Sequence, residues 1–209
     1  MNWQLVSFFG DSTVLLPSAV VLFTVLVLRK VSRALAWQWA LLFGITGTVV
    51  CISKLAFMGW GIGIREIDFT GFSGHTALST AFWPILLWLL TSRATFAVRC
   101  SAVFVGYALA VMVGYSRLMI HAHSLSEVMS GFILGACGSL IFLLLQWRAH
   151  SSRTAQISWT GALSMVIVPL VLLNTGAKAP TQSLLGEVAT MIGPLDKPFT
   201  RADLHKQIY

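Results

Sequence analysis

The sequence has few charged residues, and acidic residues are the scarcest of them. Asp, Glu, Lys and Arg make up 10% of its 209 residues, whereas soluble domains carry about 25%. Hydrophobic residues make up 56%, and the mean hydropathy is +0.81. This balance excludes an ordinary soluble domain and a disordered chain. It leaves an integral membrane protein that crosses the bilayer several times.

Cysteine is also scarce, and clusters that could hold a metal are missing. Cys51, Cys100 and Cys137 each lie in an apolar run, and none is spaced like a metal ligand from another. We interpret them as small buried apolar side chains. The net charge of +7 comes from basic residues in short loops, without aromatic residues interleaved among them. We therefore expect the lipid bilayer as a partner, and no nucleic acid.

Long runs without any charged residue or histidine predict about six transmembrane helices. Each run is long enough for a helical span, and none alternates with the period of two that a barrel needs. We predict an all-α, polytopic membrane helix bundle over residues 1–177, followed by a polar, loosely structured tail, 178–209. The tail carries none of the candidate site residues, so we expect it to be dispensable for chemistry. The six runs are 12–28, 34–53, 76–92, 100–116, 128–147 and 154–177.

Lys and Arg in the short loops predict the orientation. The loops after the first, third and fifth runs carry basic residues almost exclusively, whereas the other two also carry acidic ones. Basic loops stay in the cytoplasm. The loops around residues 61–73 and 117–127 therefore face outward. We expect a bacterial inner-membrane protein with these loops on the periplasmic side.

The two outward loops hold the residues that could carry chemistry. Ser73-Gly74-His75 comes directly before an apolar helix, whose free amides form an anion site. His123 and Glu127 are four residues apart and share a helix face, so the carboxylate can hold one imidazole nitrogen while the other attacks.

Two further basic groups lie close to these loops in the sequence. Arg117, just upstream of His123, suits a bidentate grip on phosphate oxygens. Lys54 lies near the outer end of the second run. An ionisable side chain within a membrane span is usually functional.

Together these residues resemble a known family. Ser73-Gly74-His75, with Ser116-Arg117, five residues, His123, three residues and Glu127, resembles the second and third motifs of the type-2 phosphatidic-acid phosphatase superfamily. Its members are integral-membrane lipid phosphatases, related in active site to vanadium haloperoxidases. The sequence departs from the pattern at Phe72, where the family has proline, and at Glu127, where it has aspartate.

The first motif of that family is incomplete. The pattern is a lysine with Arg-Pro seven positions on, but after Lys54 position 61 is glycine and the next arginine is Arg65.

The resemblance implies a role for each matching residue. His123 is the nucleophile that forms a phosphohistidine, Glu127 orients it, and His75 protonates the leaving oxygen. The phosphoryl oxygens are held by Arg117, Ser73, Gly74, Lys54 and Arg65. No metal or other cofactor is implied, and the substrate is a membrane lipid phosphate or pyrophosphate. His121 competes with His123 for the role of nucleophile, but no carboxylate lies four residues after it.

Two other functions remain open from the sequence. A protein that only binds or transports a lipid phosphate would keep the same pocket without turnover. Alternatively, Gly71-Phe72-Ser73-Gly74 matches the Gly-x-Ser-Gly of rhomboid intramembrane proteases, in which Ser73 would be the nucleophile and His123 its base. That scheme leaves Arg117, Glu127 and His75 without a role.

Overall fold

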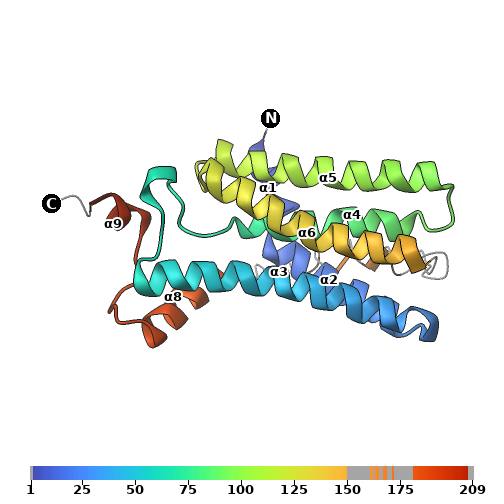
Figure 1. Ribbon diagram of the computed structural model, residues 1–209, viewed down its shortest axis with the longest axis horizontal. Coiled ribbons are helices and arrows are strands. Elements are labelled where there is room, and N and C mark those ends of the chain that lie inside the picture. The colour runs from blue at the N-terminus through green and yellow to red at the C-terminus, as the bar shows by residue number, and fades with distance from the viewer. Residues whose placement is uncertain are drawn as a thin grey trace.

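The computed structural model describes residues 2–149 and 181–206, with six isolated positions between them (161, 163, 164, 167, 168 and 171). Its main elements are helices packed lengthwise into a bundle (Figure 1). They are α1 (Trp3–Phe8), α2 (Ser12–Val27), η1 (Lys30–Ser32), α3 (Arg33–Trp60), η2 (Arg65–Ile67), α4 (Gly74–Leu90), α5 (Phe96–Met119), α6 (Leu125–Ala149), α8 (Thr181–Ile192) and α9 (Arg201–Lys206).

The helices agree with the predicted fold class. Four stretches are long and apolar enough to cross a membrane, namely Trp3–Val27, Arg33–Trp60, Phe96–Met119 and Leu125–Arg148, and α4 is a shorter apolar helix. Over the described residues the chain forms no β-strand, only an isolated bridge between Ile64 and Phe69. The prediction of an all-α membrane bundle is therefore confirmed, and five of the predicted runs coincide with helices.

The predicted sixth run, 154–177, lies outside the described residues except for the isolated positions. The helices on either side of it, α6 and α8, are described. α6 ends at one end of the bundle, and α8 lies beside the last turns of α3 at the other (Figure 1).

The loops gather at two ends of the bundle. The connections that contain η1 and residues 91–95 lie at one end, together with the end of α6 (Figure 1). Those that contain η2 and residues 120–124 lie at the other, together with α8 and α9. The basic loops thus share one end and the motif-bearing loops the opposite end, as the alternation of the predicted spans requires.

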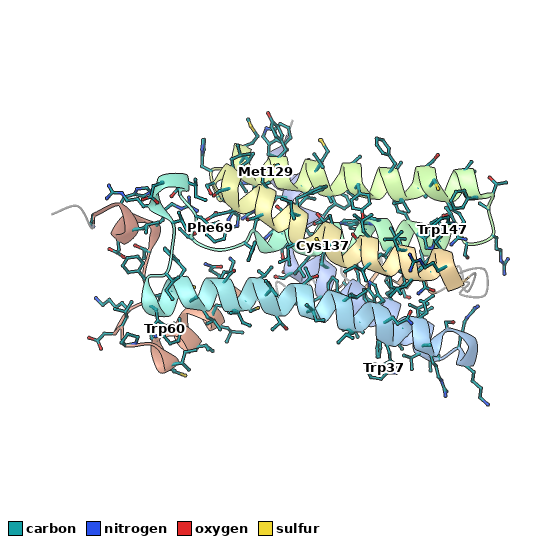
Figure 2. The ribbon with its side chains drawn as sticks, in the orientation of Figure 1. Trp37, Trp60, Phe69, Met129, Cys137 and Trp147 are labelled. Carbon is teal, nitrogen blue, oxygen red and sulfur yellow. The ribbon has the colours of Figure 1, made fainter. Side chains whose placement is uncertain are left out.

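The outer surface of the bundle is apolar, as expected where lipid replaces water. Trp37 and Trp147 project from one end of the bundle and Trp60 from the other (Figure 2). Tryptophan favours the two membrane interfaces, so these side chains mark the two edges of the apolar band. The three cysteines, expected to be buried, are exposed instead. The residues around each cysteine are apolar because this surface of the bundle is apolar, and not because the cysteines are buried.

The interior changes character along the bundle. Large apolar side chains from α2, α3, α4 and α6, including Leu22, Trp39, Phe82 and Phe142, fill the half nearer the basic loops. Buried polar groups occur at both ends. Ser32, Ser92, Arg99 and Gln146 lie near the basic loops, and Ser73, Thr76, Ser116 and Glu127 lie at the opposite end. The apolar cluster thus supports the end of the bundle where the motif residues are buried.

Glycines let α4 lie unusually close to its neighbours. A Cβ on Gly135 of α6 would be 2.3 Å from the Ala77 carbonyl oxygen, and one on Gly106 of α5 would be 2.5 Å from the Pro84 Cα. Helix packing in membranes relies on such small residues, because lipid supplies no hydrophobic force between helices. These contacts fix α4, and with it the start of that helix at the site.

Candidate active site

His123 and Glu127 form the closest pair in the site. His123 lies in the short loop between α5 and α6, and Glu127 lies in the first turn of α6. The Nδ1 atom of His123 is 2.6 Å from Oε2 of Glu127, whose side chain is wholly buried. Because a carboxylate only accepts, Nδ1 carries the proton, and Nε2 is left with its lone pair.

Glu127 also ties the two motif-bearing loops together. Its Oε1 accepts from the backbone N–H of Thr70 at 2.8 Å and from the Thr70 hydroxyl, and its Oε2 accepts from the N–H of Ser124 at 3.1 Å. Its backbone carbonyl accepts from the N–H of Ser73 at 3.1 Å. A buried carboxylate is tolerated only when it is paired and hydrogen-bonded in this way. Glu127 therefore both orients His123 and joins the loop before α4 to α6.

The pKa of His123 is held below its ordinary value. Burial of the imidazole is the main cause, because it disfavours the charged form, while the hydrogen bond to Glu127 acts in the opposite direction. The positive charges of Lys54 and Arg117 lower it further, because they disfavour a second positive charge on the ring. The neutral form, which can act as a nucleophile, is thus favoured at neutral pH.

His75 has its own carboxylate partner. It lies in the first turn of α4, and its Nε2 is 3.5 Å from Oδ2 of Asp11, the residue that caps α2. Ser73 precedes it as the N-cap residue, but its buried hydroxyl pairs with the hydroxyl of Thr76 at 2.9 Å. Each histidine of the two motifs thus faces a carboxylate.

Arg117 lies in the last turn of α5 and is held by the N-terminal helix. Its Nη1 donates to the hydroxyl of Ser7 in α1 at 2.7 Å. Its Nε is buried and has no hydrogen-bond partner among the described residues. A guanidinium with an unpaired N–H at a buried position is well suited to accept an anionic ligand.

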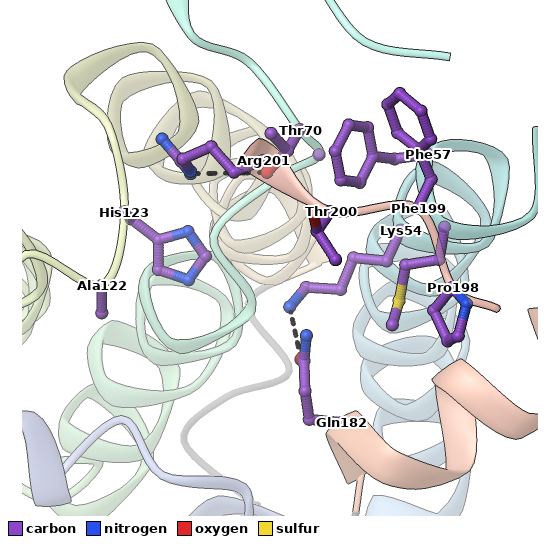
Figure 3. Close-up of a pocket in the computed structure, with 12 residues that line it drawn as sticks. Lys54, Phe57, Thr70, Ala122, His123, Gln182, Pro198, Phe199, Thr200 and Arg201 are labelled. Atoms are coloured by element: carbon purple, nitrogen blue, oxygen red, sulfur yellow. Dashed lines mark hydrogen bonds between the residues drawn. The ribbon is translucent and has the colours of Figure 1, made fainter. Parts of the chain in front are cut away.

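A cavity of about 290 Å³ lies beside His123. His123 and Lys54 project into it from different elements, and Arg201 approaches from the C-terminal segment (Figure 3). Lys54 donates to Oε1 of Gln182 in α8 at 3.1 Å. The cavity is lined by Lys54, Phe57, Met58, Thr70, Gly71, Ala122, His123, Gln182, Pro198, Phe199, Thr200 and Arg201.

Only some of the sequence-predicted site residues lie at the cavity. Lys54 and His123 share the cavity, and Glu127 lies behind His123. Arg65 lies in η2 and is not among the described residues that line the cavity. The other predicted residues outside this lining are Ser73, Gly74, His75 and Arg117. The catalytic and phosphate-binding roles given to the site residues all stay predictions.

No metal cluster is present in the described part of the chain, where no group of three or more His, Cys, Asp or Glu could hold an ion. The rhomboid arrangement is not formed either. It needs a hydrogen bond from the Ser73 hydroxyl to His123, but the Ser73 hydroxyl pairs with Thr76 and the His123 ring pairs with Glu127.

Comparisons with known proteins agree with this geometry. A family model described as the PAP2 superfamily matches residues 64–151, the stretch that contains both histidines and Arg117. The chain belongs to the PAP2 superfamily. It is also 68% identical, over 209 residues and the full length of both chains, to a Klebsiella pneumoniae protein described as "Uncharacterized 22.5 kDa protein in cps region". No solved structure matches the chain. Membership of the PAP2 superfamily supports a phosphatase-type activity.

Several residues of this PAP2 site were missed from the sequence. Thr70 comes just before the second motif, but nothing in the neighbouring sequence marks it as a hydrogen-bond donor to Glu127. Asp11 could have been noticed as a lone acidic residue beside an apolar run. Arg201 and Gln182 carry no motif, and they reach the site only through the fold.

The C-terminal tail differs from its sequence interpretation. The sequence predicts a loosely structured tail that is dispensable for chemistry. Instead its described residues form α8 and α9 and line the cavity. Tertiary contacts with the end of α3 order a segment whose polar composition predicts little structure on its own.

Proposed function

We propose that this PAP2 protein hydrolyses a lipid phosphate or pyrophosphate through a phosphohistidine on His123, without a metal ion. The observation that supports it most is the His123–Glu127 pair beside a cavity that Lys54 enters. A phosphoryl group needs little covalent help from a protein, but it needs positioned positive charge and an aligned nucleophile. The site offers both.

The first half of the reaction forms the intermediate. The Nε2 lone pair of His123 attacks phosphorus, the N–P bond forms and the P–O bond to the lipid breaks. Glu127 accepts the Nδ1–H bond and stabilises the positive charge that develops on the ring. His75 gives its proton to the leaving oxygen, and Asp11 stabilises the protonated form of His75 before that transfer. Arg117 and Lys54 hold the phosphoryl oxygens.

The second half releases phosphate. His75, now neutral, takes a proton from a water molecule as the water oxygen attacks phosphorus. The new O–P bond replaces the N–P bond, so His123 regains its lone pair and His75 its proton. Both histidines return to their starting states, and inorganic phosphate leaves.

A lipid substrate and an outward site are both part of the proposal. The site lies at one end of an apolar bundle, the end from which Trp60 projects (Figure 2). Tryptophan favours the membrane interface, where lipid headgroups lie, and this supports a lipid substrate. The loops at the opposite end carry Arg29, Lys30, Arg33 and Arg93, which favours a cytoplasmic position for that end. The headgroup is then on the periplasmic face.

Release of phosphate tests the proposed function. Purified protein in detergent, free of added metal and with a chelator present, is expected to release phosphate from a panel of lipid phosphates and pyrophosphates. Vanadate should inhibit, because it adopts the geometry of the phosphoryl-transfer transition state. No release from any member of the panel would contradict the proposal. In spheroplasts, hydrolysis of a water-soluble, impermeant phosphate ester would identify the outward face.

The acid limb of the pH–rate profile should lie at a lower pH than an ordinary histidine would give. His123 attacks only when neutral, and its pKa is below the ordinary value near 6.5. Lowering the pH from 7 should therefore not reduce kcat/KM until the pH falls through this depressed pKa, and protonation of His75, the proposed acid, should raise kcat/KM over the same interval. Lys54→Gln removes a charge that lowers the pKa of His123, so the limb should move to higher pH. An unmoved limb in Lys54→Gln would show that Lys54 does not act on His123.

A further inference from the structure

The phosphate site of this PAP2 protein lacks one guanidinium. The first motif of the family places an arginine seven positions after its lysine, but here that position is Gly61. Gly61 ends α3 with a φ of 68°, in the left-handed region, where glycine is favoured. The next arginine, Arg65, is not among the described residues lining the cavity. The match to the family model also begins only at residue 64.

The C-terminal segment lies over this position. The N–H of Phe199 donates to the Met58 carbonyl at 2.8 Å, and its ring packs edge-on against Phe57 with 5.4 Å between centroids. A Cβ on Gly61 would lie 3.5 Å from the Phe199 ring. The chain is thereby fixed to the end of α3, and Arg201 follows two residues later.

Arg201 reaches the reactive pair. Its Nη2 is 2.8 Å from each carboxylate oxygen of Glu127, so Arg201 and His123 share one of them. Its Nη1 donates to the carboxylate of Asp68, which lies in the loop before α4. Arg201 lines the same cavity as Lys54 and His123 and is about a third exposed (Figure 3).

We propose that Arg201 is a phosphate-binding residue, supplied by the C-terminal segment in place of the arginine absent from position 61. The inference rests on the proposed phosphatase function and adds a substrate ligand to it. A guanidinium has N–H groups in a planar fork, which suits two oxygens of one phosphoryl group. The phosphoryl oxygens would take the place of Asp68 on this fork, while Glu127 keeps its hold on His123.

Equilibrium binding of inorganic phosphate and of vanadate to the full-length protein in detergent tests this assignment. Arg201→Gln should weaken both by about tenfold to a hundredfold, as expected for a charge-assisted hydrogen bond. Arg201→Lys should lose less, because it keeps the charge but not the fork. Lys206→Gln is the matched control, since it removes one positive charge from the same helix, α9, at an exposed position. It should bind both anions as the unchanged protein does.

A second variant distinguishes an Arg201 that binds phosphate from an Arg201 that only holds the C-terminal segment in place. Asp68→Asn removes the carboxylate that holds Arg201 and leaves Arg201 in place, and asparagine tolerates the positive φ of 50° at this position. If Arg201 binds phosphate, Asp68→Asn should bind the anions as tightly as the unchanged protein, or more tightly. If Arg201 only holds the C-terminal segment in place, Arg201→Gln and Asp68→Asn should both lose affinity for phosphate and vanadate.

The outcomes are distinct. Loss in Arg201→Gln with no loss in Asp68→Asn supports the assignment. Equal loss in both, or no loss in Arg201→Gln, overturns it while the phosphatase proposal stands on its own turnover assay. Absence of both anion binding and turnover in the unchanged protein overturns the proposed function, and the role of Arg201 with it.

Discussion

Replacing His123 with alanine should remove nearly all phosphate release. The substitution takes away the Nε2 atom proposed to form the covalent intermediate, and loss of a nucleophile typically lowers kcat by several orders of magnitude. The effect on folding should be small, because the side chain lies in a loop beside a cavity. Rapid-quench reactions with a labelled lipid phosphate should trap an acid-labile, base-stable phosphoprotein in the unchanged protein and none in the variant.

His121→Asn is the control for this experiment. His121 is two residues away in the same loop, is exposed, and has a positive φ of 53° that asparagine also adopts. The variant should keep both the trapped label and its turnover. Label on His121, or unchanged turnover in His123→Ala, would show that the nucleophile has been misassigned.

Replacing Glu127 with glutamine should have the second largest effect. The amide cannot supply the negative charge that stabilises the imidazolium as the N–P bond forms, so kcat should fall by about 10²–10⁴-fold. The change also leaves Arg201 facing a neutral group at the point where it now meets a carboxylate at 2.8 Å. Single-turnover measurements should place the loss in the chemical step, with substrate binding less affected.

Two variants bracket this result. Glu66→Gln removes an exposed carboxylate from η2 and should leave the rate unchanged. Glu127→Asp restores the residue of the family pattern but shortens the arm by one carbon, so it should recover part of the rate. A Glu127→Gln protein with nearly full kcat would mean that the charge behind His123 is not used in the reaction.

The helices were predictable because the period and length of apolar runs carry that information locally. Residues 34–53 and 128–147 were recognised as spans, and α3 and α6 contain them. The burial of single residues within a span was not predictable. Cys51 and Cys137 lie in apolar sequence on a surface that faces lipid, and an apolar sequence does not distinguish that surface from a core.

The site was predictable where its residues lie close in sequence. His123 and Glu127 are one helical turn apart, so their pairing follows from helix geometry. Asp11 lies 64 positions from His75, and Arg201 lies 74 from Glu127. Such contacts depend on how the helices pack, and no local pattern encodes them.

Both ends of the chain meet at one reaction centre, with Ser7 and Asp11 on one side and Gln182 and Arg201 on the other. A ribosome makes the last of these residues after every described helix from α1 to α8. A chain still being inserted therefore contains His123 before the C-terminal residues that line the cavity, among them Arg201, have been made. If Arg201 binds phosphate as proposed, a product terminated before Arg201 should bind phosphate more weakly than the full chain.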